Sequence, residues 1–332
     1  MADKVAVITG ASSGIGRASV RAFAQAGYKL GLIARSQEGL DAAAREAETA
    51  GSAAVVVVGD VVKPEAIERL ATETEARFGP IDLWVNNAMV TVLSPVAEMT
   101  AEEFRRVMEV NYLGTVHGTL AALARMGPRD RGTIVQVGSA LAYRSIPLQS
   151  AYCASKAAIR GFTDSLRSEL LHDRSGVRLT MVQLPAVNTP QFEVMRNRMP
   201  RKSQPVQPIF SPYTIAAAIL YAAEHPGREM VVGASALQAI VAQKVAPGLI
   251  DRYLARNGYE SQQREQPERP GRPDNLFETL PGDRGAEGPF TDRSRRSSIQ
   301  LWLRERPLLT IASALAMVAA GLSLAVRRRA KP

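Results

Sequence analysis

The stretch VAVITGASSGIG, residues 5–16, joins a short apolar run to a glycine-rich turn, and a helical pattern follows over residues 16–26. Glycine suits places where the backbone turns sharply and must let a phosphate approach closely. A helix N-terminus offers free N–H groups and a partial positive charge to an anion. The order strand, turn, helix therefore predicts a nucleotide-binding site, with a glycine-rich turn that binds nothing as the alternative.

The rest of the chain up to residue 256 repeats the order of strand and helix. Further short apolar runs occupy residues 30–34, 53–58, 83–86, 133–137, 179–184 and 230–232. Helical spacing fills residues 37–50, 64–78, 101–125, 151–172 and 212–224 between them. Such near-continuous apolar strands alternating with helices are typical of a parallel sheet covered on both faces. We therefore predict one α/β domain, residues 1–256, with a doubly wound, seven-stranded parallel sheet.

The amino-acid composition and the hydrophobic pattern of the chain change after this domain. Residues 257–306 are rich in Pro, Gly, Arg and Glu and lack a sustained apolar period, which predicts a solvated, mostly disordered linker. Residues 307–327 hold an uncharged run from 308 to 326, which would span about 28 Å at ~1.5 Å per residue, close to the ~30 Å of a bilayer core. We predict a transmembrane helix there, with a buried core helix as the alternative, and a basic tail at residues 328–332.

Composition narrows the class of protein. The formal net charge is +9, but much of the excess lies in the last forty or so residues, where it suits a membrane flank better than a nucleic-acid surface. The single cysteine, Cys153, excludes an intramolecular disulfide. The three histidines are scattered without metal-ligand spacing, so we expect no metal site. The first apolar run is too short for a signal peptide and leads directly into the glycine-rich turn.

A second pattern suggests proton chemistry. Tyr152 and Lys156 lie four residues apart on one face of a predicted helix. A free tyrosine, with a pKa of ~10, is a poor acid or base at neutral pH, and a nearby ammonium group lowers that pKa. Ser139 follows the predicted strand 133–137, at a strand end where ligands bind in open α/β sheets. Its hydroxyl is placed to hydrogen-bond a reacting oxygen.

Several motifs now agree in order and spacing. Thr-Gly-x-x-x-Gly-x-Gly at residues 9–16, Asn86-Asn87-Ala88 at a strand end, Asn111 in a helix, Ser139 and Tyr152-x-x-x-Lys156 resemble the classical short-chain dehydrogenase/reductase family over residues 3–235. The resemblance implies a Rossmann fold and a phosphate cradle made by Gly10, Ser12, Ser13, Gly14, Ile15 and Gly16. One departure is Met89, which stands where the family has glycine and is expected to alter the pocket wall near the nicotinamide.

The resemblance also implies the catalytic roles. Tyr152 becomes the acid or base, and Lys156 lowers its pKa and holds the nicotinamide ribose. Ser139 steadies the substrate oxygen. Asn111 shapes a helix kink and holds a water in a proton relay to Lys156.

The residue after the second strand indicates which dinucleotide binds. In this fold it faces the adenosine ribose, where a carboxylate favours NAD and an arginine meets the 2′-phosphate of NADP. Arg35 and Ser36 occupy this place, and no acidic residue lies between the second strand and Glu38, so we expect NADP(H). An arginine that points to solvent is the alternative. The remaining cofactor contacts implied by the resemblance are Asp60, Val61, Asn87, Ala88, Tyr152, Lys156, Val187 and Thr189.

The expected function is hydride transfer between NADP(H) and a carbonyl or secondary alcohol. Apolar residues after Thr189, where the family carries its substrate lid, fit either a lipophilic pocket or core packing: Phe192, Met195, Met199, Ile209 and Phe210. A hydrophobic substrate is therefore expected. Two alternatives remain: a nucleotide-sensing or scaffolding protein that kept the fold without the chemistry, and an epimerase or dehydratase of the family's extended branch.

The predicted location follows from the C-terminal helix. We expect a membrane-anchored protein whose catalytic domain is cytoplasmic, because no signal peptide is seen and the chemistry needs NADPH. Basic residues flank both ends of the helix, so charge bias does not decide its orientation. The helices at residues 101–125 and 151–172 commonly form subunit interfaces in the family, which leaves a homo-oligomer open.

Overall fold

The computed structural model describes residues 4–305, and its centre is a sheet of seven parallel strands in the order β12-β7-β6-β4-β1-β2-β3. The strands are β1 (Lys4–Thr9), β2 (Tyr28–Ala34), β3 (Ala54–Val58), β4 (Leu83–Asn86), β6 (Gly132–Val137), β7 (Val177–Gln183) and β12 (Glu229–Val231). Chain order runs outward in opposite directions from β1 and β4, so the switch point of the sheet lies between them. The predicted doubly wound parallel sheet is confirmed.

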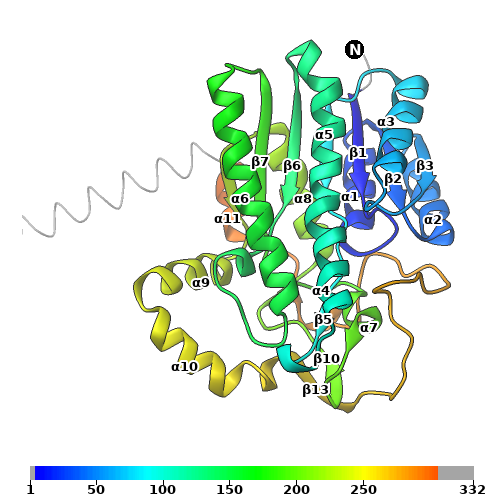
Figure 1. Ribbon diagram of the computed structural model, residues 1–332. Coiled ribbons are helices and arrows are strands. Elements are labelled where there is room, and N and C mark those ends of the chain that lie inside the picture. The colour runs from blue at the N-terminus through cyan, green and yellow to red at the C-terminus, as the bar shows by residue number, and fades with distance from the viewer. Residues whose placement is uncertain (1–3, 306–332) are drawn as a thin grey trace, which may run out of the picture.

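Helices cover both faces of this sheet, as Figure 1 shows. Side chains alternate along β1, so Ala6 and Ile8 face one layer while Val5 and Val7 face the other. The first layer consists of α1 (Gly14–Gln25), α2 (Gln37–Thr49) and α8 (Pro212–Glu224), and the second of α3 (Pro64–Phe78), α4 (Ala101–Met108), α5 (Gly114–Met126) and α6 (Ser150–His172).

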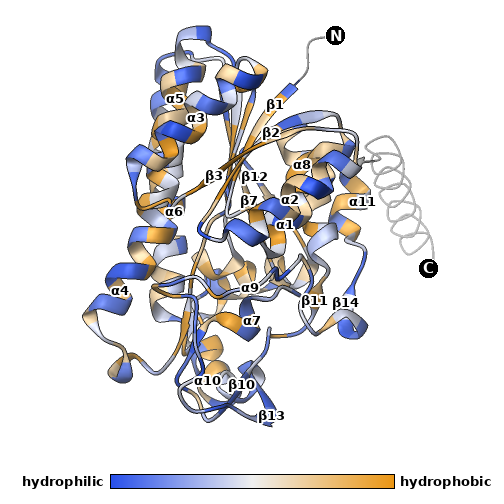
Figure 2. Cartoon of the chain, turned by 90° about the vertical axis from the view of Figure 1, so that its right-hand side faces the viewer, coloured by the Kyte–Doolittle hydropathy of each residue, from blue (hydrophilic) through white to orange (hydrophobic). Residues whose placement is uncertain are grey.

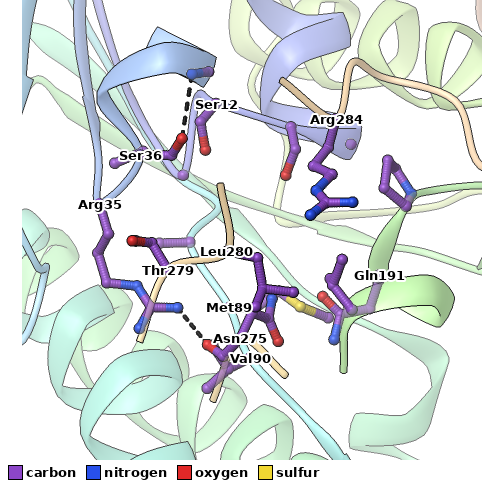
Figure 3. Close-up of a pocket in the computed structure, with 18 of the residues that line it drawn as sticks. Ser12, Arg35, Ser36, Met89, Val90, Gln191, Asn275, Thr279, Leu280 and Arg284 are labelled. Atoms are coloured by element: carbon purple, nitrogen blue, oxygen red, sulfur yellow. Dashed lines mark hydrogen bonds between the residues drawn. The ribbon is translucent and has the colours of Figure 1, made fainter. Parts of the chain in front are cut away.

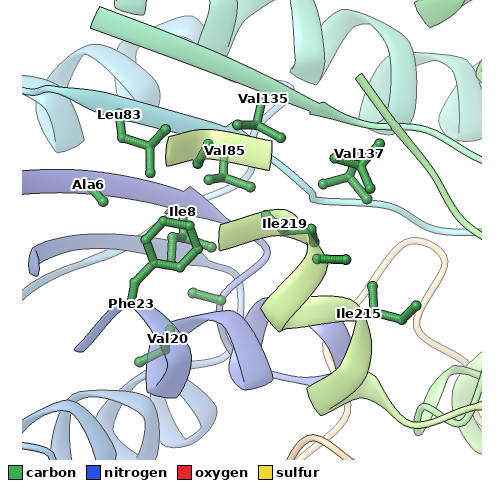
Figure 4. Packing of buried hydrophobic residues seen from close by; sticks show 14 of the residues in the cluster. Ala6, Ile8, Val20, Phe23, Leu83, Val85, Val135, Val137, Ile215 and Ile219 are labelled. Atoms are coloured by element: carbon green, nitrogen blue, oxygen red, sulfur yellow. The ribbon is translucent and has the colours of Figure 1, made fainter. Parts of the chain in front are cut away.

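The first layer packs tightly under the switch point. In Figure 4, Phe23 of α1 and Ile219 of α8 lie against Ile8 of β1 and Val85 of β4. All four side chains are fully buried. Burial of one such side chain contributes about 1.5–3 kcal/mol to the stability of the fold. This packing holds α1 against the end of β1.

The segment predicted as one helix over residues 101–125 is interrupted. A π-helix, η2 (Glu109–Leu113), separates α4 from α5, and Asn111 lies within it. The distortion expected at Asn111 is therefore present. The helix begins with a capping box, in which Thr100 accepts from the backbone N–H of Glu103 and the Glu103 carboxylate accepts from that of Thr100.

The prediction of a disordered linker is wrong for residues 257–305. Two helices, α9 (Ala234–Val245) and α10 (Pro247–Asn257), lead into an extended chain that packs against the domain at the lower end of Figure 1. There β13 (Gln263–Pro267) pairs with β10 (Arg201–Ser203). Further on, β14 (Ser294–Arg295) pairs with β11 (Ile209–Phe210), which also pairs with β8 (Ala186–Val187). The described chain ends in α11 (Ile299–Glu305).

Isolated anchors explain why this segment packs without a periodic pattern. Leu276 and Phe290 are buried to 0% and 3% exposure, although the chain around them is largely hydrophilic, as the blue β13 region in Figure 2 illustrates. Ion pairs also hold this segment, namely Arg196 with Asp274 at 2.7 Å before Leu276 and Arg17 with Asp283 at 3.1 Å between the two anchors. Single buried side chains at irregular spacing leave no helix or strand period for sequence analysis to detect.

Shorter elements complete the described chain: β5 (Val92–Leu93) paired with β9 (Arg196–Asn197), α7 (Gln191–Val194), and the 3₁₀ turns η1 (Val96–Glu98), η3 (Gly127–Arg129), η4 (Ala140–Ala142), η5 (Glu260–Gln262) and η6 (Thr291–Arg293). Within residues 4–305 no helix has the length and apolar character needed to cross a bilayer. The predicted transmembrane helix at residues 307–327 and the basic tail at 328–332 lie outside the described residues.

Candidate active site

The glycine-rich turn after β1 is shaped by close backbone contacts. Gly10 has a φ of 69°, in the left-handed region that favours glycine. A Cβ on Gly16 would lie 2.0 Å from the carbonyl oxygen of Gly10, so α1 comes this close to the turn only because residue 16 is glycine. The arrangement is a cradle that side chains would fill, and it fits the phosphates of a dinucleotide.

Thr9 couples this turn to the end of β4. Its hydroxyl oxygen accepts hydrogen bonds from the backbone N–H groups of Asn87 (2.9 Å) and Ala88 (3.0 Å). The Asn87 side chain donates back to the Thr9 carbonyl at 2.9 Å. Thr9 therefore positions two expected cofactor contacts, a role that sequence reasoning did not assign to it.

A pocket opens at the carboxyl ends of β1 to β4, next to the switch point, and Figure 3 shows it from close by. Met89, the departure from the family pattern, forms part of its wall, as expected. Four of the expected cofactor residues do not line it: Gly16, Tyr152, Lys156 and Val187. The expected cofactor residues that line it are Gly10, Ser12, Ser13, Gly14, Ile15, Arg35, Ser36, Asp60, Val61, Asn87, Ala88 and Thr189.

Arg35 projects onto the wall of this pocket and is held there by the C-terminal segment. Its guanidinium donates to the carbonyl oxygens of Asn275 (2.5 Å) and Phe277 (3.0 Å). Burial and the charge of Arg106 lower the pKa of Arg35. A guanidinium has more N–H donors than two carbonyls use, so Arg35 keeps donors for an anion. This placement does not fit the alternative of an arginine pointing to solvent.

Two neighbouring residues are engaged in structural bonds. The Ser36 hydroxyl accepts from the backbone N–H of Gly39 (3.2 Å) and caps α2. The carboxylate of Asp60 accepts from the backbone N–H of Val62 (3.1 Å) and from Arg106 (2.5 Å). Both nevertheless line the pocket.

The expected catalytic residues come from three elements that pack together. Ser139 follows β6, Tyr152 and Lys156 lie on α6, and Asn111 lies in η2. The Lys156 ammonium donates to the carbonyl of Val137 at 2.7 Å and lies 5.6 Å from the centre of the Tyr152 ring. The structure thus brings the lysine to the tyrosine ring.

Asn111 is fully engaged by the protein. Its side-chain oxygen accepts from the backbone N–H of Val90 (2.8 Å), and its NH₂ donates to the Val90 carbonyl and the Ser155 hydroxyl, both at 3.0 Å. These bonds tie the π turn to α6 and to the chain after β4. The proton relay through a water near Asn111 stays a prediction.

Burial controls the proton affinities at this centre. It raises the pKa of Tyr152, and a hydrogen bond with Ser139 opposes that rise without cancelling it. Burial also lowers the pKa of Lys156 to about 8. We expected Lys156 to lower the pKa of Tyr152; burial, which disfavours the phenolate, is the largest influence on this pKa, and the effect of Lys156 stays a prediction. A tyrosine with a raised pKa stays protonated at neutral pH.

A family comparison agrees with this geometry. The model of the family described as short chain dehydrogenase matches residues 4–199. The chain belongs to the short-chain dehydrogenase family. It is therefore an oxidoreductase of a family that acts on alcohol and carbonyl groups with a nicotinamide cofactor.

Individual relatives extend this comparison. The "Uncharacterized oxidoreductase YxnA" of Bacillus subtilis is 34% identical over 96% of this chain and 89% of its own. A "Fatty acyl-CoA reductase" of Acinetobacter baylyi is 34% identical over 66% of this chain and 72% of its own. Among solved structures, an alcohol dehydrogenase from Thermococcus sibiricus complexed with 5-hydroxy-NADP is 31% identical with a TM-score of 0.59, covering 69% of this chain and 94% of its own.

The apolar residues expected in the family's lid divide into two groups. Phe192, Met195 and Met199 gather with Leu93 and Leu148 in a small cluster of their own, beside the turn that precedes α6. Ile209 and Phe210 instead form β11, where both are buried as part of the packed sheet between β8 and β14. The interpretation as core packing therefore holds for these two residues.

Sequence reasoning missed one whole wall of the pocket. Five residues of the segment predicted as a linker line it: Asn275, Thr279, Leu280, Gly282 and Arg284. The signal that could have found them is weak, because it consists of single apolar residues such as Leu276 between prolines and glycines. The match to the short-chain dehydrogenase family model ends before this segment, at residue 199.

Proposed function

We propose that the protein is an NADP(H)-dependent oxidoreductase that transfers a hydride between the nicotinamide and a carbonyl or secondary alcohol. The observation that carries the choice of NADP(H) is Arg35. It follows β2, where a carboxylate would favour NAD, and two backbone carbonyls hold its guanidinium at the pocket wall. The Thermococcus sibiricus relative bound to an NADP analogue supports the same choice.

The chain's own residues divide the work of binding. The cradle at Gly10 and Gly16 admits the diphosphate, and Arg35 faces the 2′-phosphate through its remaining N–H donors. When bound, the nicotinamide supplies or accepts the hydride. Thr189 and the backbone of Val187 would contact its carboxamide.

Proton transfer is assigned to Tyr152. The Tyr152 hydroxyl is protonated at neutral pH and can donate a proton to a carbonyl oxygen during reduction, although burial raises its pKa and makes it a weaker acid. The Ser139 hydroxyl hydrogen-bonds the same oxygen and steadies it. As the phenolate forms, the Lys156 ammonium beside the ring stabilises the new charge.

Titration of the full chain with NADPH and NADH tests the cofactor assignment. A charge-assisted contact contributes about 1.5–3 kcal/mol, so NADPH should bind roughly ten- to a hundredfold more tightly. Arg35→Ala should remove most of that difference. Arg45→Ala, which removes an exposed charge on α2 outside the pocket, should preserve it. Equal or tighter binding of NADH by the unmodified chain would overturn the assignment.

A hydrophobic substrate is part of the proposal. The fatty acyl-CoA reductase among the relatives supports it, whereas Leu93, Leu148 and Met195 of the apolar cluster are themselves packed in a buried core. We expect long-chain aldehydes and bulky apolar ketones to give higher kcat/KM values than small polar ketones. Turnover of small polar ketones only would refute this part.

We also propose that residues 307–327 anchor the protein in a membrane, with the catalytic domain on the cytoplasmic side. The uncharged run and its basic flanks support the anchor. Protease added to sealed vesicles or cells distinguishes the orientations. We expect that protease added on the non-cytoplasmic side leaves the catalytic domain intact. Digestion of the catalytic domain by that protease would contradict the proposal.

A further inference from the structure

One side of the cofactor pocket is formed by a segment far from the glycine-rich turn in sequence. We call residues 274–286 the C-terminal strap. Thr279, Leu280 and Gly282 of this strap line the same pocket as the turn between β1 and α1. In Figure 3, Leu280 of the strap lies between Arg35 on one side and Arg284, also of the strap, on the other. The strap is therefore a wall of the site.

The first half of the strap is fixed near the adenosine end of the pocket. Leu276 is fully buried, and its carbonyl oxygen accepts from Nε of Arg106 at 2.9 Å. The neighbouring carbonyls of Asn275 and Phe277 accept from Arg35. These contacts hold Arg35 at the wall before any ligand arrives, which reduces the entropy lost when a ligand binds.

The second half is fixed to the start of α1. The carbonyl of Gly285 accepts from the backbone N–H of Gly14 at 2.9 Å. Asp283 pairs with Arg17 at 3.1 Å, and the Arg17 side chain is buried on α1. The backbone N–H of Gly282 donates to the Glu38 carboxylate at 2.5 Å. Three independent contacts thus place Arg284 beside the phosphate cradle.

Arg284 itself carries a charge that the protein leaves largely unused. Within residues 4–305, its guanidinium makes one hydrogen bond, from Nη2 to the carbonyl of Pro281 at 2.9 Å, and no ion pair. Its side chain lines the pocket and extends into it from the side opposite Arg35. Meanwhile Gly285 occupies the N–H of Gly14, one of the free donors at the N-terminus of α1 that would otherwise face an anion.

We propose that Arg284 is a cofactor-binding residue that contacts the diphosphate of the dinucleotide. The strap takes one helix N–H from the cradle and supplies a full positive charge in its place, and arginine pairs well with phosphate oxygens. This inference rests on the proposed dinucleotide site. It gives the two arginines different binding roles. Arg35 binds the 2′-phosphate that only NADP(H) carries, and Arg284 binds the diphosphate that both dinucleotides carry.

The two tasks predict different patterns of lost affinity. In the full chain, Arg284→Ala should weaken NADPH and NADH alike, by about tenfold, and leave their ratio unchanged. Arg35→Ala should change the ratio instead. Arg269→Ala is the matched control, because Arg269 is an exposed arginine of the same C-terminal segment that does not line the pocket, and it should leave both affinities unchanged.

A second readout follows the strap directly and needs no activity. Binding of either dinucleotide should slow hydrogen exchange at the amides of residues 282–286, and Arg284→Ala should remove most of that protection. Thermal unfolding without dinucleotide should be the same for Arg284→Ala and Arg269→Ala, which shows that the strap still packs. Arg284→Lys, which keeps the charge, should recover part of the affinity.

Several results would overturn the inference. Unchanged affinity of Arg284→Ala for both dinucleotides would show that the guanidinium stays outside the site. Loss of NADPH affinity without loss of NADH affinity would move Arg284 to the 2′-phosphate. A preference of the unmodified chain for NADH would refute only the proposed NADP(H) specificity, because the effect of Arg284 on both dinucleotides would remain measurable.

Discussion

Replacing Lys156 with methionine measures how much the buried ammonium group lowers the stability of the folded chain. The side chain is 3% exposed, and burial lowers its pKa from 10.5 to about 8. At ~1.4 kcal/mol per unit of pKa, this shift corresponds to about 3 kcal/mol of lost stability when the ammonium form is buried. Because the folded-state pKa lies below the unfolded-state value, the folded chain binds fewer protons between these two pH values. The stability contributed by Lys156 is therefore present above pH 10.5 and lost as the pH falls through about 8.

The assay is denaturant unfolding of the full chain and of Lys156→Met at neutral pH and near pH 10. Other groups titrate alike in both proteins, so the difference between them isolates Lys156. From neutral pH to pH 10, we expect the free energy of unfolding of the unmodified chain to rise by about 2–3 kcal/mol relative to that of Lys156→Met. Lys244→Met, which removes an exposed lysine on α9, should show no such change. Parallel pH curves for the chain and Lys156→Met would refute the reasoning.

Three further substitutions test the site and its supports. Gly16→Ala should weaken dinucleotide binding by more than about tenfold, because its Cβ would lie 2.0 Å from the Gly10 carbonyl, and unchanged titration curves would contradict this. Asn111→Leu should lower the free energy of unfolding by about 2–3 kcal/mol, since buried partners such as the Ser155 hydroxyl lose their hydrogen bonds; a loss within measurement error in denaturant unfolding would exclude it. Leu276→Ala should lower the free energy of unfolding by about 2–4 kcal/mol and also weaken NADPH binding. Unchanged NADPH affinity would show that the strap does not contribute to the cofactor site.

The sheet and the cradle could be predicted because their signals are local. The central strands are runs of apolar residues buried on both faces, and the predicted runs lie within a few residues of the observed strands. The glycine-rich turn is fixed by residues next to one another in sequence. Tyr152, Lys156 and Ser139 could be found for the same reason, because a helical spacing and a strand end place them.

The remaining features depend on contacts between distant parts of the chain. Nothing near Arg35 indicates that Asn275 and Phe277 hold it, because those carbonyls come from a segment without periodic pattern. The direction of the Tyr152 pKa could not be predicted either. It depends on how completely the folded chain excludes water from the hydroxyl, whereas the spacing to Lys156 shows only that a charge is near.

Oxidation of reduced dinucleotide by the full chain with a long-chain aldehyde tests the assigned chemistry most directly, when the chain and Tyr152→Phe are compared. We expect NADPH to be consumed faster than NADH, and Tyr152→Phe to lose about a hundredfold or more in turnover while it binds NADPH as tightly as before. Equal turnover by Tyr152→Phe would contradict the assignment of Tyr152 as the proton donor. Binding of NADPH without turnover of any carbonyl would favour the nucleotide-sensing alternative.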